Sequence, residues 1–319
     1  MSAATTSLGD VLQGSGTDTG LDVVTGAFSY SGRAIAEQLI AAGRTVRTLT
    51  GHPQRVDGTL ASVEVGTLCF DDPVRLAAQM AGATTLYNTY WVRFPHGRTT
   101  HDSAVANSRA LFHAARRAGL ERIVHVSITH PSVESPYPYF RGKAHVEQAL
   151  AETGLPFAIV RPAILFGRKG VLINNIAWLL RNLGVFAIAG DGQYQLRPVH
   201  VDDLARVCVS LGRSRTDQLV DAVGPERLSF DALVRQVRGA VGSRARIVHV
   251  PAAVVPPVSS LLGRLLRDVL LTGEELRAMM GGLADTDGPA TGEVVLSTWL
   301  EAHAEDLGRS YANELKLHF

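Results

Sequence analysis

A tyrosine and a lysine four positions apart are the side chains in this sequence best suited to chemistry. Tyr139 and Lys143 belong to the run Tyr-Phe-Arg-Gly-Lys, whose spacing puts both on one face of a helix. Seven tyrosines and three lysines in 319 residues would give such a pair by chance only about 0.07 times. An ammonium beside a phenol favours the phenolate and lowers its pKa, so Tyr139 is predicted to exchange a proton with a carbonyl or alcohol oxygen. Lys143 would also hold ribose hydroxyls.

Hydroxyl side chains end the strand that precedes this helix. Ser127, or failing it Thr129, is predicted to donate a hydrogen bond to the same substrate oxygen. The alternative is ordinary structure, in which a surface pair at i and i+4 accompanies strand-end hydroxyls that act as caps.

A glycine turn follows the first expected strand and leads directly into a helix. Gly26 and Gly32 take the first and third positions of the pattern G-x-x-G-x-x-G, and Ser29 takes the middle one. Small residues there allow a tight turn and let a pyrophosphate approach the helix N-terminus. We therefore predict a dinucleotide site, and the other turn residues expected to contact the cofactor are Phe28, Tyr30 and Ser31.

The segment after the second strand decides which nicotinamide cofactor is expected. Residues 43–56 hold no acid to bind the ribose hydroxyls of NAD, and their basic residues are Arg44, Arg47, His52 and Arg55. Room for a 2′-phosphate is therefore predicted, so that NADP(H) is favoured over NAD(H). The alternative is that these side chains are merely solvated.

Further cofactor contacts are expected at the ends of other strands. Asp71 and Asp72 could reach the adenine amino group, although Asp72 could equally cap the helix that begins at Pro73. The remaining predicted contacts, also at strand ends, are Thr50, Asn88 and Pro162.

Short apolar runs alternate with helical segments from residue 21 to residue 161. This alternation predicts a Rossmann-type α/β fold with a doubly wound parallel sheet. The expected strands are 21–25, 45–50, 62–68, 84–90, 122–127 and 156–161, and the expected helices are 31–42, 73–80, 99–118 and 139–153.

The regular alternation of strands and helices ends after residue 161. This change predicts a smaller, mostly helical C-terminal lobe that binds substrate. The expected division is a disordered tail over residues 1–20, a dinucleotide-binding domain over 21–168 plus 199–224, and a substrate lobe over 169–198 plus 225–319. Residues 252–271 are apolar, and they could form core or lid, or a dimer face or membrane-contacting surface.

The motifs together resemble the short-chain dehydrogenase/reductase superfamily. The turn TGAFSYSG, the strand end at Ser127, YFRGK, IVRPAILFG and RPVHVDDLA are similar to its extended and atypical branches. These include NmrA-like proteins, NAD-dependent epimerase/dehydratases and an accessory subunit of respiratory complex I. The resemblance implies Tyr139 as the acid/base, Lys143 as the ribose anchor and Ser127 as the carbonyl-polarising hydroxyl. Three features depart from the pattern: Ser29 in place of glycine, the short Ser127–Tyr139 separation, and the bulky run 88–91.

Composition and residue spacing bear on the expected partners, location and metal content of the protein. With Lys+Arg at 31 and Asp+Glu at 30, nothing favours a nucleic-acid partner. The two cysteines suit reduced thiols in a cytoplasmic protein, and the apolar stretches are too interrupted for an integral membrane span. The N-terminus does not read as a signal peptide. The histidines lack ligand spacing, so no metal is expected.

Three functions are compatible with these residues. The first is an NAD(P)(H)-dependent oxidoreductase that acts on a small, apolar carbonyl or alcohol. A second copy of the chain, forming a homodimer, is a further partner to consider. The alternatives are a non-catalytic NmrA-like regulator and an epimerase or dehydratase. The expected pocket aromatics are Phe28, Tyr90, Trp91, Phe94 and Trp178.

Overall fold

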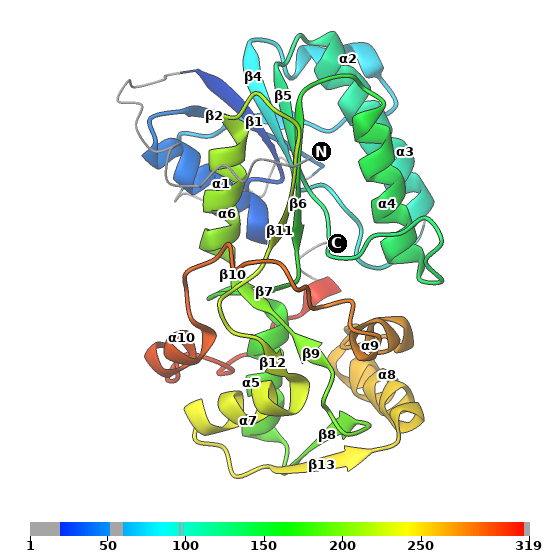
Figure 1. Ribbon diagram of the computed structural model, residues 1–319, viewed down its shortest axis with the longest axis vertical. Coiled ribbons are helices and arrows are strands. Elements are labelled where there is room, and N and C mark those ends of the chain that lie inside the picture. The colour runs from blue at the N-terminus through cyan, green and yellow to red at the C-terminus, as the bar shows by residue number, and fades with distance from the viewer. Residues whose placement is uncertain (1–19, 52–59, 96, 98, 316–319) are drawn as a thin grey trace, which may run out of the picture.

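Seven strands pair in parallel in the order β11-β6-β5-β4-β1-β2-β3. They lie in the upper part of a computed structural model that describes residues 20–51, 60–95, 97 and 99–315 (Figure 1). The strand order reverses between β1 and β4, which is where such sheets bind ligands. The strands are β1 (Leu21–Thr25), β2 (Thr45–Thr50), β3 (Glu64–Thr67), β4 (Ala83–Asn88), β5 (Arg122–Val126), β6 (Phe157–Pro162) and β11 (Gln218–Ala222).

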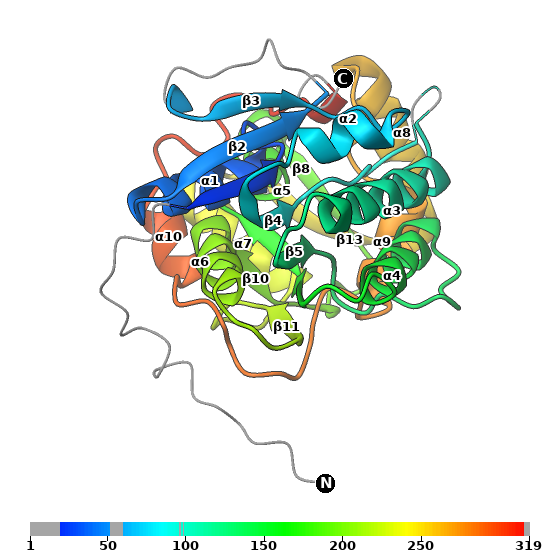
Figure 2. The same ribbon diagram turned by 90° about the horizontal axis from the view of Figure 1, so that it is seen from above.

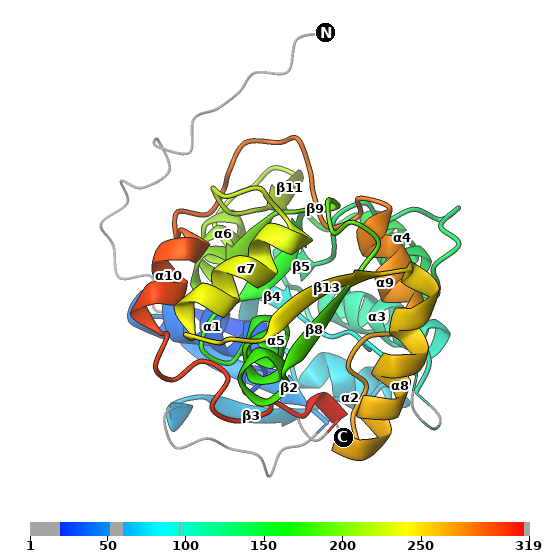
Figure 3. The same ribbon diagram turned by 90° about the horizontal axis from the view of Figure 1, so that it is seen from below.

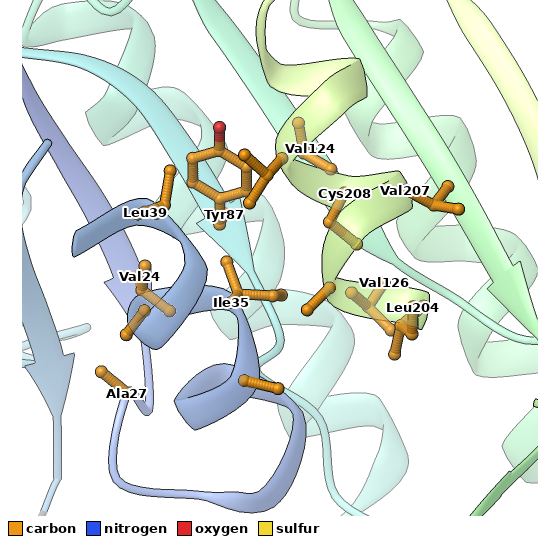
Figure 4. Packing of buried hydrophobic residues seen from close by; sticks show 14 of the residues in the cluster. Val24, Ala27, Ile35, Leu39, Tyr87, Val124, Val126, Leu204, Val207 and Cys208 are labelled. Atoms are coloured by element: carbon orange, nitrogen blue, oxygen red, sulfur yellow. The ribbon is translucent and has the colours of Figure 1, made fainter. Parts of the chain in front are cut away.

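Helices cover both faces of this sheet, as Figure 2 shows. One face carries α1 (Tyr30–Ala41) and α6 (Val201–Gly212); the other carries α2 (Pro73–Ala78), α3 (His101–Arg117) and α4 (Pro138–Ala151). Each layer buries an apolar cluster, because the strands are apolar on both sides. In the first cluster, side chains of α1 and α6 point at those of β1, β4 and β5 (Figure 4).

A second group of elements lies beyond the carboxyl ends of the strands, and we call residues 169–198 and 225–315 the second lobe (Figure 1). Its core gathers side chains of α5, α7, α10 and β8 around Phe166 and Trp299, whose ring centroids are 5.5 Å apart. The helices of this lobe are α5 (Val171–Asn182), α7 (Phe230–Ala240), η3 (Ala252–Val254), α8 (Val255–Leu266), α9 (Gly273–Met280) and α10 (Leu296–Ala302).

Short strand pairs complete the structure. β7 pairs with β10 and β8 with β13 in parallel, whereas β9 pairs with β12 in antiparallel fashion. Their bounds are β7 (Ile164–Phe166), β8 (Val185–Ala189), β9 (Gln195–Leu196), β10 (Pro198–His200), β12 (Leu228–Ser229) and β13 (Arg246–Val250).

The run RPVHVDDLA anchors the returning C-terminal segment. Arg197 donates hydrogen bonds to the carbonyl oxygens of Gly224, Thr286 and Gly288. Buried Asp203 accepts from the amides of Glu293 and Val294 at 2.8 and 2.9 Å. Arg197 is thus a structural residue.

The predicted fold class is confirmed, and the expected elements agree with the observed ones to within a few residues. Both cysteines are buried and free. No helix in the described ranges combines the length and apolar character needed to cross a membrane. The predicted tail, except for Gly20, lies outside the described residues. The division into two domains stays a prediction.

Candidate functional site

The glycine turn has the geometry that a pyrophosphate requires. Gly26 has a φ of 66°, in the left-handed region that favours glycine. A Cβ on Gly32 would lie 2.2 Å from the carbonyl oxygen of Gly26, so only glycine fits there. The first-turn amides of α1 have no partner within the helix, and that turn carries no acidic residue. These features fit an anionic dinucleotide phosphate.

Ser29, in place of the middle glycine, is compatible with this turn. It is the N-cap of α1 with a φ of −88°, so the position does not require glycine. Its hydroxyl donates to the carbonyl oxygen of Gly26 at 2.6 Å, which leaves the first-turn amides of α1 unoccupied by this side chain.

One cavity of about 910 Å³ runs from this turn to the second lobe. Phe28, Ser29 and Tyr30 line one end, and Tyr139 lines it farther along. Other parts of the wall come from the segments after β4, β5 and β6 and from residues of α9. The cavity therefore lies at the carboxyl ends of the strands, where the reversal of strand order places a ligand.

Tyr139 lies among aromatic rings. Its ring meets those of Trp91 and His101 edge to face, at centroid distances of 5.7 and 5.9 Å. Burial raises the pKa of its phenol to about 12, while Arg93 lowers that pKa and Glu275 raises it. The phenol is thus neutral near pH 7, which suits a proton donor. The expectation that Lys143 lowers this pKa is wrong for this arrangement.

The partners of Lys143 are groups other than the phenol. Its ammonium donates to the carbonyl oxygen of Val126 at 2.9 Å and lies 4.8 Å from the centroid of the Trp91 ring. Burial lowers its pKa to about 7, although Glu147 raises it. Among the described residues, no hydrogen bond joins Lys143 to Tyr139, and Lys143 lies outside the cavity lining.

The two hydroxyls expected to hold the substrate oxygen differ in their surroundings. Ser127 is buried, and its Oγ has no hydrogen-bond partner within the described ranges. Thr129 lines the cavity, but its hydroxyl donates to the carbonyl oxygen of Leu283 at 2.7 Å. Ser127 therefore keeps a free donor, whereas Thr129 holds the second lobe.

Two of the basic residues expected near a 2′-phosphate have structural partners instead. Buried Arg44 makes a two-pronged ion pair with Asp22, at 2.8 and 2.9 Å. Arg47 pairs with Glu64 at 2.7 Å. The support that these two arginines lend to NADP(H) is therefore withdrawn. His52 and Arg55 lie outside the described residues.

Several other predicted contacts also have structural roles. Asp72 accepts from the amide of Arg75 at 2.9 Å, so it caps α2, as the alternative held. Asn88 is buried; its Oδ1 accepts from Thr25, and its Nδ2 donates to His125. It joins β1, β4 and β5.

The remaining predicted contacts lie outside the cavity lining. Asp71 is exposed, and Pro162 is buried with its carbonyl oxygen accepting from the amide of Thr129. Thr50 ends β2, and Ser31 is half-buried in the first turn of α1. The cavity thus contains only part of the predicted set.

An ion-pair cluster at the cavity was missed by the sequence analysis. Arg93, after β4, pairs with Glu275 of α9 at 2.8 Å and with Glu314. These residues are far apart along the chain and form no local pattern, so no signal in the sequence identifies them. Of the expected pocket aromatics, Phe28 and Phe94 line the cavity, whereas Tyr90, Trp91 and Trp178 do not.

Comparison with known proteins identifies the family. Residues 26–211, more than half of the chain, match the NAD(P)H-binding family. The chain belongs to the NAD(P)H-binding family. This confirms the predicted resemblance to the extended dehydrogenase/reductase group, and the match covers the glycine turn and the helix with Tyr139.

Curated relatives of this NAD(P)H-binding protein include uncharacterized and respiratory proteins. An uncharacterized protein of Mycobacterium tuberculosis is 29% identical over 222 residues, which are 69% of this chain but only 23% of that one. The chain thus spans about a quarter of that relative. The 40 kDa subunit of the mitochondrial NADH-ubiquinone oxidoreductase of Neurospora crassa is 22% identical over 262 residues, 79% of this chain and 68% of that one.

Solved structures share the fold. The NADPH-dependent quinone oxidoreductase of Escherichia coli, complexed with NADPH, has a TM-score of 0.73 at 17% identity and covers 89% of this chain and 100% of its own. The triphenylmethane reductase of Citrobacter sp., complexed with NADP(H), has a TM-score of 0.72 at 19% identity and covers 89% and 99%.

Proposed function

We propose that this protein is an NADP(H)-dependent oxidoreductase that interconverts a small, apolar carbonyl compound and its alcohol, with quinones among the candidate substrates. The observation that carries the proposal is the shared cavity: residues 28–30 of the glycine turn and Tyr139 both line it. A cofactor held at the turn and a substrate beside the phenol would then meet in one space. The second lobe supplies the far wall and is proposed as the substrate lobe.

The proposed chemistry assigns proton transfer to Tyr139. When bound, the nicotinamide supplies or accepts the hydride. The phenol, kept neutral by burial, would donate a proton to the substrate oxygen during reduction. The hydroxyl of Ser127, which has no partner among the described residues but lies outside the cavity lining, would donate a hydrogen bond to the same oxygen once it turns toward the cavity. Lys143 would bind the ribose after its ammonium turns from the carbonyl oxygen of Val126.

The preference for NADP(H) rests on the lack of an acid at the end of β2 and on His52 and Arg55. The two reductases described above are crystallised with the phosphorylated form, which agrees with this preference, whereas another protein of similar fold, MoeE5, is crystallised with NAD. Since their identity to this chain is low, they support the preference only by analogy.

The direct test follows NADPH oxidation against a panel of aldehydes, ketones and quinones. We expect turnover with at least one apolar member of the panel and none when the cofactor is omitted. Absence of turnover across the panel, in protein that binds NADPH, would favour a different function.

A non-catalytic dinucleotide-binding regulator or scaffold is the second candidate. The observation that favours it is the position of Trp91, which contacts both Lys143 and Tyr139. A protein that only binds the cofactor does not need those two side chains aligned. An epimerase is the third candidate. The nucleotide that co-purifies with the protein distinguishes it from a reductase, since firmly retained NAD would favour an epimerase and exchangeable NADPH would favour a reductase.

A further inference from the structure

Helix α8 presents an apolar face to solvent. The exposed fractions are 43% for Val254, which lies just before the helix, 48% for Val258, 67% for Leu261 and 80% for Leu265. Their spacing of four, three and four residues puts them on one side of a helix. Ser259 and Gly263 are the buried positions on the opposite side, so the aliphatic side is the one that no described residue covers.

The neighbouring strand pair continues this apolar surface. In β8, Phe186 and Ile188 are buried, whereas the alternate residues Val185 and Ala187 are exposed. Exposed Val248 of β13 is the register partner of Ala187. Figure 3 looks onto this end of the second lobe, where α8 lies beside β8 and β13. We call the set the basal surface: Val185, Ala187, Val248, Val254, Val258, Leu261 and Leu265.

The segment that contains β13 and α8 carries basic side chains and no acidic ones. Residues 232–267 contain no Asp or Glu, although the protein as a whole has 30 acidic and 31 basic residues. The next acid, Asp268, is buried and accepts from Tyr311, Glu314 and Leu315. The exposed arginines of this segment are Arg235, Arg244, Arg246, Arg264 and Arg267, of which Arg235 is paired with Asp231. The basal surface is therefore apolar with a basic border.

An apolar surface with a basic border suits some binding partners better than others. A second copy of the chain would bring its own arginines against these, so like charges would oppose that pairing. Nucleic acid would use the arginines but not the aliphatic residues, since bases stack on aromatic rings. Anionic lipid uses both, because arginines attract headgroups while aliphatic side chains enter the boundary of the acyl region.

We propose that the basal surface binds membranes that carry anionic lipids. The protein would lie on the bilayer surface without spanning it. α8 leads into α9, whose residues line the cavity, so docking would hold the cavity near the bilayer. The binding itself does not depend on the proposed enzymatic activity.

Vesicle flotation of the full chain tests this proposal. We expect binding to mixed phosphatidylcholine–phosphatidylserine vesicles, weakening with salt, and no binding to phosphatidylcholine alone. Arg264→Gln and Arg267→Gln should each weaken binding about fivefold, the effect of removing one charge near an anionic surface. Leu261→Ser combined with Leu265→Ser should abolish it. Val74→Ser, at a 60% exposed position on α2, is the matched control and should bind like the parent.

The outcomes that overturn the proposal are equally specific. They are no vesicle binding, equal binding to neutral vesicles, or undiminished binding both in the variant with Leu261→Ser and Leu265→Ser and in the two glutamine variants. A dimer in light scattering that the serine pair dissociates, without vesicle binding, would assign the surface to a second copy. Unchanged melting temperature and NADPH affinity establish that each variant is folded. If the variant with Leu261→Ser and Leu265→Ser is not folded, Arg264→Gln and Arg267→Gln, at exposed positions, still test the proposal.

Discussion

The ammonium of Lys143 lies over the indole ring of Trp91, 4.8 Å from its centroid. The same indole meets the ring of Tyr139 edge to face, so it contacts both residues of the predicted pair. Gly142 makes this possible, because a Cβ there would lie 2.8 Å from the indole. The chemical partner of Lys143 in this structure is therefore an aromatic face and a backbone carbonyl.

The first prediction concerns the charge on Lys143. Because the chain has only three lysines, lysine-selective ¹³C labelling gives three side-chain signals, and Lys143→Met identifies one. That signal should titrate near pH 7, since burial lowers its pKa to about that value. Trp91→Ala should raise this pKa, because water would replace the indole. A titration near pH 10.5 in the parent protein would contradict the burial seen here.

The second prediction is the pH dependence of stability. The pKa of Lys143 falls from 10.5 to about 7 on folding, so between these values the unfolded chain binds more protons. Stability relative to Lys143→Met should therefore rise with pH across this window and be flat below it. Urea unfolding of both proteins at pH 6, 8 and 10 measures the difference. A difference that falls with pH would refute the assignment.

The third prediction concerns Tyr139 and requires a substrate found by the screen. Tyr139→Phe removes only the hydroxyl, so NADPH affinity should change little while turnover falls by about 10²–10⁴. Because the pKa of the phenol is about 12, its deprotonation should not reduce the rate of reduction up to about pH 10. Near-parental turnover in Tyr139→Phe would leave the dinucleotide site intact and favour the regulator.

The fourth prediction concerns cofactor choice. NADPH should bind about tenfold more tightly than NADH, a difference of roughly 1.4 kcal/mol that calorimetry resolves. Arg47→Ala should leave that ratio unchanged, because Arg47 is paired with Glu64. Arg55→Ala should reduce it. Tighter binding of NADH to the parent protein would reverse the assignment.

The fifth prediction concerns the glycine turn. Gly32→Ala should abolish binding of both cofactors, because the added Cβ would lie 2.2 Å from the carbonyl oxygen of Gly26 and force the turn open. Gly43→Ala is a contrasting control: its Cβ meets nothing within 4 Å, and the backbone strain from its φ of 81° lies beyond the C-terminal end of α1, whereas the turn precedes α1. Fluorescence titration with NADPH checks both variants. Undiminished binding in Gly32→Ala would place the phosphate elsewhere.

The sequence by itself determined the elements and the turn. The runs at β1, β2 and β5 place apolar residues on both faces, and Gly26 and Gly32 lie between a strand and a helix, so local pattern and backbone sterics suffice to predict them. The alternation of those elements then limits the topology to a parallel, doubly wound sheet.

Only the tertiary structure decided which side chains meet. By its position in the sequence Arg44 could bind a phosphate, but in the folded chain it pairs with Asp22 of the neighbouring strand. Arg93 pairs with Glu275, 182 positions away along the chain, and no periodicity encodes such a pair. The spacing of Tyr139 and Lys143 defines a shared helix face, but Trp91 from another segment determines where Lys143 points. Patterns along the chain report backbone conformation, whereas side-chain partners depend on packing between distant segments.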